Sequence, residues 1–144
     1  MSAEHPDAHA GLLIKDGKIE PVWIDKFGHG ANAVRELIGD AFCSCFHIPI
    51  TTSRVLVGYC DDNFLQKPEL TLNVFLSANI YDWPAPGYPI HGPIVVSAVR
   101  VPDTVSMTDT ERSRFYIEDS SGGPILRYNW HEHQKERVWH PKEF

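Results

Sequence analysis

The feature that most constrains the fold is the run at residues 94–101, which reads Ile-Val-Val-Ser-Ala-Val-Arg-Val. Five of these eight residues are β-branched, and such side chains pack well on a pleated sheet. The segment before the run, residues 83–89, contains three prolines, which fix φ and remove backbone donors. We therefore expect a loop over residues 83–89, followed by a central strand over residues 94–101.

A β-hairpin is predicted near the start of the chain. Two β-prone runs, residues 12–15 and 18–24, flank Asp16-Gly17, a pair that tolerates the positive φ angles of a tight turn. Because Pro21 cannot donate to a ladder, the second strand is expected to be an edge strand there or to begin at Val22.

Further strands and helices follow along the chain. Residues 41–50 and 54–60 predict two adjacent strands, and a last strand is expected after residue 124. Apolar spacing predicts helices over residues 31–38, closed by Gly39, and over residues 72–81. The capping box formed by Thr108 and Glu111 predicts a third, short helix over residues 109–117.

These elements predict the α+β class. We expect a single compact domain with a mostly antiparallel or mixed sheet of about five strands and two or three helices packed on it. Residues 1–10 are expected to be a flexible N-terminal arm, residues 11–119 the domain, and residues 120–144 a C-terminal extension docked on the domain. Trp130 and Trp139 in that extension are expected to cover an apolar patch, either on the domain itself or on a partner.

Charge and hydropathy exclude several classes of protein. The 144 residues carry a net charge of −6, the wrong sign for holding phosphate backbones, so direct nucleic-acid binding is disfavoured. No apolar run approaches the roughly 18 residues of a membrane span, and the first residues lack the pattern of a signal peptide. Three cysteines fit a reducing compartment better than a disulfide framework. We therefore expect a cytoplasmic protein that does not bind membranes.

One cluster of side chains has metal-ligand chemistry. Cys43, Cys45 and His47 are spaced by two, which places them on one face of a strand, and Cys60 falls on the strand expected next to it. Thiolate and imidazole are zinc ligands, so zinc is the candidate cofactor. The spacing matches no common zinc motif, and cysteine also packs as a small hydrophobe. Core packing, zinc binding and thiol chemistry therefore remain open for these residues.

No catalytic motif is present, which favours a protein without enzymatic activity. A small ligand would require a pocket between residues 83–93 and the turn at residues 28–30. The residues expected to line such a pocket are His29, Trp83, Tyr88 and His91.

Three stretches are typical of a known family: Ile38-Gly39-Asp40 after the first helix, Leu-Thr-Leu-Asn-Val-Phe-Leu-Ser-Ala at residues 70–78, and Gly-Tyr-Pro-Ile-His-Gly-Pro-Ile-Val-Val at residues 87–96. In this pattern the chain resembles the domain of unknown function 3846 family of small phage and actinobacterial proteins. The sequence departs from the family at Asp40, where a second glycine is usual, at Thr71, where proline is usual, and at Tyr88-Pro89, where an acidic residue is usual. The resemblance covers residues 11–100 and implies a compact α+β domain in a phage or mobile-element context, without an established reaction.

The sequence therefore predicts a non-enzymatic accessory protein that binds a host macromolecule or a small ligand and so modulates host processes or defence. A protein partner at a basic site would suit the acidic chain. The alternative is a small metal- or thiol-dependent protein that uses the cysteine and histidine cluster. The sequence leaves open whether the protein forms a homo-oligomer.

Overall fold

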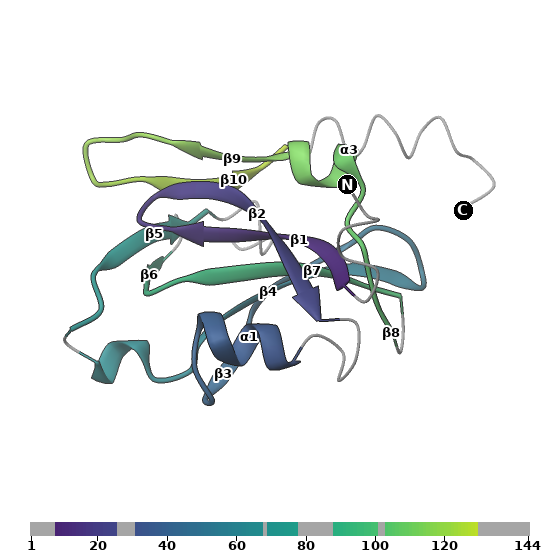
Figure 1. The fold of residues 1–144 in the computed structure, drawn as a ribbon. Coiled ribbons are helices and arrows are strands. Elements are labelled where there is room, and N and C mark those ends of the chain that lie inside the picture. The colour runs from purple at the N-terminus through teal and green to yellow at the C-terminus, as the bar shows by residue number, and fades with distance from the viewer. Residues whose placement is uncertain (1–7, 26–30, 68, 78–87, 101–102, 130–144) are drawn as a thin grey trace.

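The computed structural model of the chain describes residues 8–25, 31–67, 69–77, 88–100 and 103–129 (Figure 1). Ten strands form two sheets in these residues. The six-stranded sheet contains β1 (Ala8–Lys15), β2 (Lys18–Asp25), β3 (Phe42–Pro49), β4 (Arg54–Asp61), β7 (Ile94–Arg100) and β8 (Asp103–Val105). The four-stranded sheet contains β5 (Leu72–Leu76), β6 (Tyr88–His91), β9 (Phe115–Glu118) and β10 (Ile125–Tyr128). The helices are α1 (Ala31–Leu37), α3 (Asp109–Ser113) and a 3₁₀ turn (Phe64–Gln66).

The six-stranded sheet confirms the strands predicted with the clearest local signals. Its order is β2-β1-β7-β4-β3, with β8 on β7, and all neighbours are antiparallel. β7 is central, as predicted from its β-branched run. Asp16 and Gly17 have φ angles of 55° and 72°, so both central residues of the β1–β2 turn adopt the positive φ of a primed turn. β2 is an edge strand along its whole length, which explains how it accommodates Pro21.

The four-stranded sheet has the order β6-β5-β10-β9. β5 pairs in parallel with β10, and the other two pairings are antiparallel, so this sheet is mixed. β1 begins at Ala8, and β10 lies within the segment expected to be an extension. The strand expected after residue 124 is thus an internal strand of this sheet.

The structure contains more strand and less helix than the sequence predicts. The molecule is mostly β, with two sheets in place of one sheet of about five strands, and the described residues contain two short α-helices. The helix predicted over residues 72–81 is wrong where the structure describes it, because β5 occupies Leu72–Leu76. Val74 and Leu76 enter the core while Phe75 points away, which is the period of two of a strand. In a short apolar run this period cannot be distinguished from that of a helix.

The third predicted helix is shorter than expected. Thr108 and Glu111 form the predicted capping box, in which the Thr108 side chain accepts from the Glu111 amide and the Glu111 side chain accepts from the Thr108 amide. The helix ends at Ser113, and Phe115–Glu118 form β9 because Phe115 and Ile117 pack into the core between the sheets.

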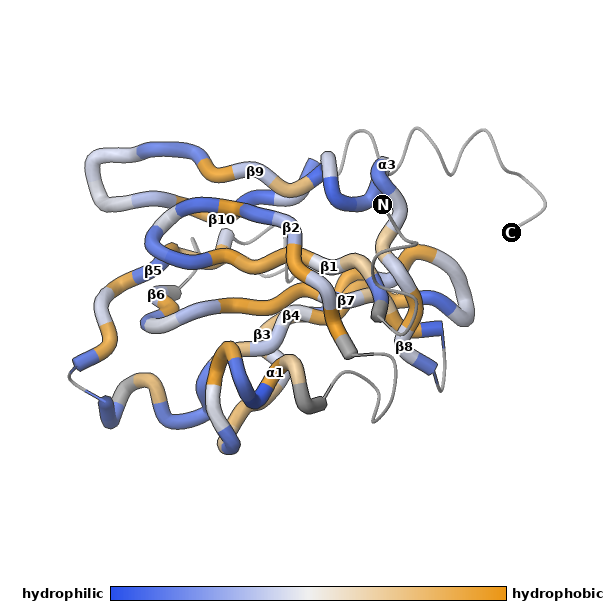
Figure 2. The backbone as a smooth tube through the Cα atoms, viewed as in Figure 1, coloured by the Kyte–Doolittle hydropathy of each residue, from blue (hydrophilic) through white to orange (hydrophobic). Residues whose placement is uncertain are grey.

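Two apolar clusters cover the two faces of the six-stranded sheet. One face packs against the four-stranded sheet through residues such as Ile14, Leu56, Val96 and Leu126. The other face packs beneath α1, where Val34 contacts the cluster that contains Val95. Figure 1 shows α1 lying against this sheet, and Figure 2 shows hydrophobic residues concentrated along β1, β4 and β7. None of the helices in the described segments has the length and apolar composition needed to cross a membrane.

A buried ion pair joins the six-stranded sheet to α3. Arg54 donates from Nε to Glu111 Oε2 at 2.8 Å and from Nη2 to Glu111 Oε1 at 2.7 Å. Arg54 Nη2 also donates to the Ser106 carbonyl oxygen at 2.8 Å. Such a bidentate ion pair fixes the orientation of both side chains and so positions α3 at the start of β9.

Candidate functional site

The three cysteines converge on one edge of the six-stranded sheet. Cys43 and Cys60 are directly opposite each other in the antiparallel register of β3 and β4. β3 is the edge strand, and Cys45 lies two residues further along it. The prediction that these two strands are adjacent is therefore confirmed, and their pairing brings the three thiols together.

A β-bulge separates His47 from these thiols. The register of β3 and β4 shifts between Ser44 and Phe46, so one extra residue is inserted in β3. Cys45 and Phe46 are consequently both buried, and His47 is exposed. Strict alternation would have placed His47 on the face of Cys43 and Cys45, and that expectation is wrong because the bulge reverses the faces beyond it.

The thiols lie at the boundary of the core. Cys45 and Cys60 are 6% and 2% exposed and belong to the apolar cluster between the sheets, while Cys43 packs against this cluster from a partly exposed position. None of the three is part of a disulfide. Cys43 and Cys45 are both within hydrogen-bonding reach of the Cys60 sulfur, and Cys43 is also within reach of the Asp62 carboxylate.

These contacts give the three thiols different pKa values. Hydrogen bonding to Cys45 and, to a lesser extent, to Cys43 lowers the pKa of Cys60, although burial opposes this change. The hydrogen bond to Cys60 and burial raise the pKa of Cys45. Burial and the hydrogen bond to Asp62 raise the pKa of Cys43 to about 12. Cys60 is therefore the thiol favoured as a thiolate, with the S–H group of Cys45 as its main donor.

The predicted zinc ligands do not form one group. His47 points away from the three sulfurs, and no set of three or more His, Cys, Asp and Glu side chains within the described ranges is arranged to hold a metal ion. The imidazole of His47 is therefore not placed to bind zinc together with the cysteines. The groups that the structure brings together at this edge are three thiols.

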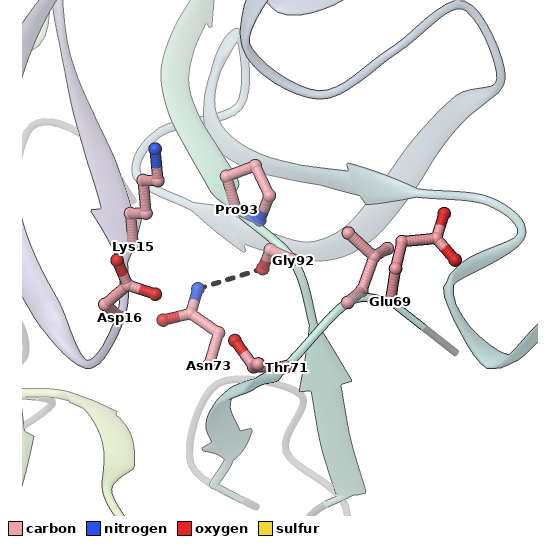
Figure 3. Close-up of a pocket in the computed structure, with 8 residues that line it drawn as sticks. Lys15, Asp16, Glu69, Thr71, Asn73, Gly92 and Pro93 are labelled. Carbon is pink, nitrogen blue, oxygen red and sulfur yellow. Dashed lines mark hydrogen bonds between the residues drawn. The ribbon is translucent and has the colours of Figure 1, made fainter. Parts of the chain in front are cut away.

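A second candidate site is a small pocket between two turns (Figure 3). It is lined by Lys15, Asp16, Glu69, Leu70, Thr71, Asn73, Gly92 and Pro93 and has a volume of about 140 Å³. Typical sites for small organic ligands are clefts of roughly 300–1,000 Å³. The pocket thus offers room for only a few atoms.

Asn73 uses the polar atoms of its side chain to hold the pocket walls together. Its Oδ1 accepts from the Gly17 amide at 2.9 Å, and its Nδ2 donates to the carbonyl oxygens of Ile14 at 2.7 Å and Gly92 at 3.1 Å. Figure 3 shows the bond to Gly92. Asn73 therefore ties the β1–β2 turn to the β6–β7 turn, and its amide is already occupied by the fold.

The other predicted binding residues are only partly described. His91 ends β6 and stacks on Phe64 with ring centroids 5.9 Å apart, next to the pocket residue Gly92. The backbone of Tyr88 belongs to β6, but its side chain lies outside what the structure describes. His29, Trp83, Trp130 and Trp139 lie outside the described residues.

The sequence reading missed a third candidate, the outer face of the four-stranded sheet. Its inner face packs on the six-stranded sheet, and the register places Phe75, Ile125 and Glu118 side by side on the opposite face, with Arg127 and Tyr116 in the next row. Leu72 lies beside Phe75, since both approach Gly123. The period of two of a strand, applied to residues 125–128, could have placed Ile125 and Arg127 together on one face.

This outer face is apolar at its centre and carries one ion pair. Leu72 and Tyr116 are 36% and 44% exposed, although both are large side chains with apolar surface. Arg127 Nη2 lies 3.0 Å from Glu118 Oε2. Within the described part of the chain, the buried Nε of Arg127 has no hydrogen-bond partner. No described element covers this face, in contrast to both faces of the six-stranded sheet.

Comparisons of the chain with protein-family models, with curated proteins and with solved structures found no significant match.

Proposed function

We propose that this is a non-enzymatic accessory protein that binds a protein partner through the outer face of the four-stranded sheet. The observation that carries the proposal is the contrast between the two sheets. The six-stranded sheet is covered on both faces, whereas the outer face of the other sheet presents Leu72 and Tyr116 to solvent around half-buried Phe75 and Ile125. Exposed aromatic and aliphatic side chains gathered on one face are typical of protein interfaces.

The polar groups on this face suit a protein partner. The carboxylate of exposed Glu118 offers an acceptor next to the apolar centre, as in an interface whose rim is polar. The net charge of −6 favours a partner of opposite charge, because complementary charge accelerates association and disfavours wrong partners. The resemblance to the domain of unknown function 3846 family supports a place in a phage-derived or mobile-element context, where the partner is a host protein in the bacterial cytoplasm.

Binding of a small ligand has less support. The pocket between the two turns is small, and the fold itself occupies the amide of its most buried polar residue, Asn73. A thiol-dependent role is favoured by one specific observation, the convergence of Cys43, Cys45 and Cys60, and it is compatible with binding at the opposite layer of the molecule.

Site-specific photo-crosslinking tests the proposed surface. A photoreactive phenylalanine analogue replaces Tyr116 on the outer face, and in a matched variant it replaces Thr52, which is exposed in the β3–β4 turn. After irradiation in a lysate of the native host, we expect one adduct from position 116 that position 52 does not give. The captured protein is then purified and its affinity for the unmodified chain is measured.

The affinity of the purified pair decides the proposal. We expect Leu72→Asp to weaken binding by at least tenfold, because a carboxylate at the apolar centre must be desolvated, and Thr52→Asp to leave it unchanged. Equal affinities for these two variants, or equal adducts at both positions, would contradict the proposal. If the adduct is a dimer of this chain, the surface is a self-association site and a host partner is ruled out there.

A further inference from the structure

The edge formed by β3 and β4 brings two free thiols into the geometry of a disulfide. Cys43 and Cys60 are directly opposite residues of an antiparallel pair. Such residues have Cα atoms about 4.5–5.5 Å apart, inside the roughly 4.4–6.8 Å that disulfides span. Both side chains face the core between the sheets, so their Cβ atoms lie on the same side of the ladder.

We propose that Cys43 and Cys60 are a modification site that forms an intramolecular disulfide when the protein meets a hydroperoxide. The role goes beyond partner binding, because the site lies on the six-stranded sheet and not on the outer face proposed above. The class of oxidant follows from the burial of the site. Cys60 is 2% exposed on β4, the strand next to the edge strand β3, and a hydroperoxide is small enough to reach it where larger disulfide reagents would not.

The roles of the three cysteines follow from their contacts. Cys60 is the attacking thiol, since the S–H group of Cys45 donates to its sulfur and lowers its pKa. Cys43 is the resolving thiol, because it stands directly opposite Cys60 and is the more exposed partner. Cys45 sits in the bulge and has no residue directly opposite in the register, so it supports the thiolate without forming the bridge.

The reaction has two balanced steps. The Cys60 thiolate attacks one oxygen of hydrogen peroxide, an S–O bond forms, the O–O bond breaks, and hydroxide leaves and is protonated to water. The Cys43 sulfur then attacks the sulfenyl sulfur of Cys60, the S–S bond forms, the S–O bond breaks, and the hydroxyl group leaves as water with the proton of Cys43. Two thiols are oxidised, and one peroxide is reduced to two molecules of water.

Peptide mapping of the folded, full-length protein tests this site. The folded protein is treated with hydrogen peroxide and is then unfolded in denaturant, so that buried Cys45 can react. The remaining thiols are alkylated with N-ethylmaleimide, and the intact mass and the linked peptides are measured. We expect loss of two hydrogens, one alkylated cysteine, and a Cys43–Cys60 linkage that dithiothreitol reverses. A bridge between Cys45 and Cys60, a bridge between two copies of the chain, or three alkylated thiols would overturn the proposal.

A matched pair of variants separates the two roles. Cys43→Ala is expected to abolish the disulfide and to leave a sulfenic acid on Cys60 that dimedone traps. Cys45→Ala is expected to retain the disulfide and to form it more slowly, because Cys60 loses a donor. An unchanged disulfide yield in Cys43→Ala contradicts the assignment. If either variant fails to fold, the linkage mapped in the unsubstituted protein decides the question.

Discussion

At the residue scale, single polar side chains connect segments that are distant in the sequence. Asn73 bonds two neighbouring turns from within a strand. Asn73 is only 3% exposed, and the cost of burying its side-chain amide is compensated because the amide oxygen and nitrogen both have hydrogen-bond partners. A residue of this kind specifies how two sheets meet, and its role depends on the element in which it lies.

Glu111 has a similar connecting role, and its charge makes stability depend on pH. Burial alone would raise its pKa, but hydrogen bonds from Arg54 and from the Thr108 amide outweigh burial and lower the pKa. A carboxyl whose pKa is lower in the folded than in the unfolded state stabilises the fold above the unfolded value of about 4.3. This contribution is lost as the pH falls through the lowered folded pKa.

Glu111→Gln should therefore weaken the fold at neutral pH and flatten its acid dependence. We expect a loss of about 3 kcal/mol at pH 7, because the substitution leaves the buried Arg54 charge without its counter-charge. Urea unfolding from pH 7 down to pH 3 measures both effects. Asp119→Asn, at an exposed position, is the control and should change little. Equal acid dependence in Glu111→Gln and the unsubstituted protein would show that this ion pair does not set it.

At the element scale, the bulge in β3 determines which side chains meet. It turns Phe46 into the core, directly over Gly58 of β4, and it turns His47 out to solvent. A Cβ atom at Gly58 would lie 2.2–2.6 Å from atoms of the Phe46 ring, so glycine is required for the ring to lie there. The bulge, the ring and the glycine form one local arrangement next to the cysteines.

Gly58→Ala is expected to destabilise the protein by about 1–3 kcal/mol, because the added methyl group overpacks a filled core. The same substitution in a Phe46→Leu background should cost less, since the smaller side chain leaves room for the methyl group. Chemical denaturation of the four members of this cycle gives the coupling between the two positions. Gly122→Ala, in an open turn, is the control. Additive effects at positions 46 and 58 would argue against the contact.

At the scale of the whole molecule, one apolar cluster is shared by both sheets. Residues of the four-stranded sheet such as Leu126 and Val74 pack against residues of the six-stranded sheet such as Val96 and Ile14, all fully buried. Neither sheet can lose this contact without exposing the other. The two sheets should therefore fold as one cooperative unit, although the chain passes between them several times.

Leu126→Ala tests this cooperativity. The cavity is expected to cost about 2–5 kcal/mol, and hydrogen exchange of amides in β7 and β10 should accelerate by the same factor under native conditions. Arg100→Ala, at an exposed position on β7, should leave both rates unchanged. If β10 amides lose protection while β7 amides keep it, the sheets unfold separately and the shared core does not couple them.

The sequence by itself determined the elements whose signals are local. The Asp16-Gly17 turn, the capping box at Thr108 and the β-branched run of β7 were predicted because turn geometry, helix capping and β-branching act within a few residues. Tertiary structure decided the rest. Residues 72–76 form a strand because β6 pairs along them and β10, some fifty positions later, pairs with Phe75 and Leu76. The face of His47 was set by a bulge that only the pairing with β4 defines. Local pattern specifies an element, whereas contacts between distant residues choose its partner and the face it presents.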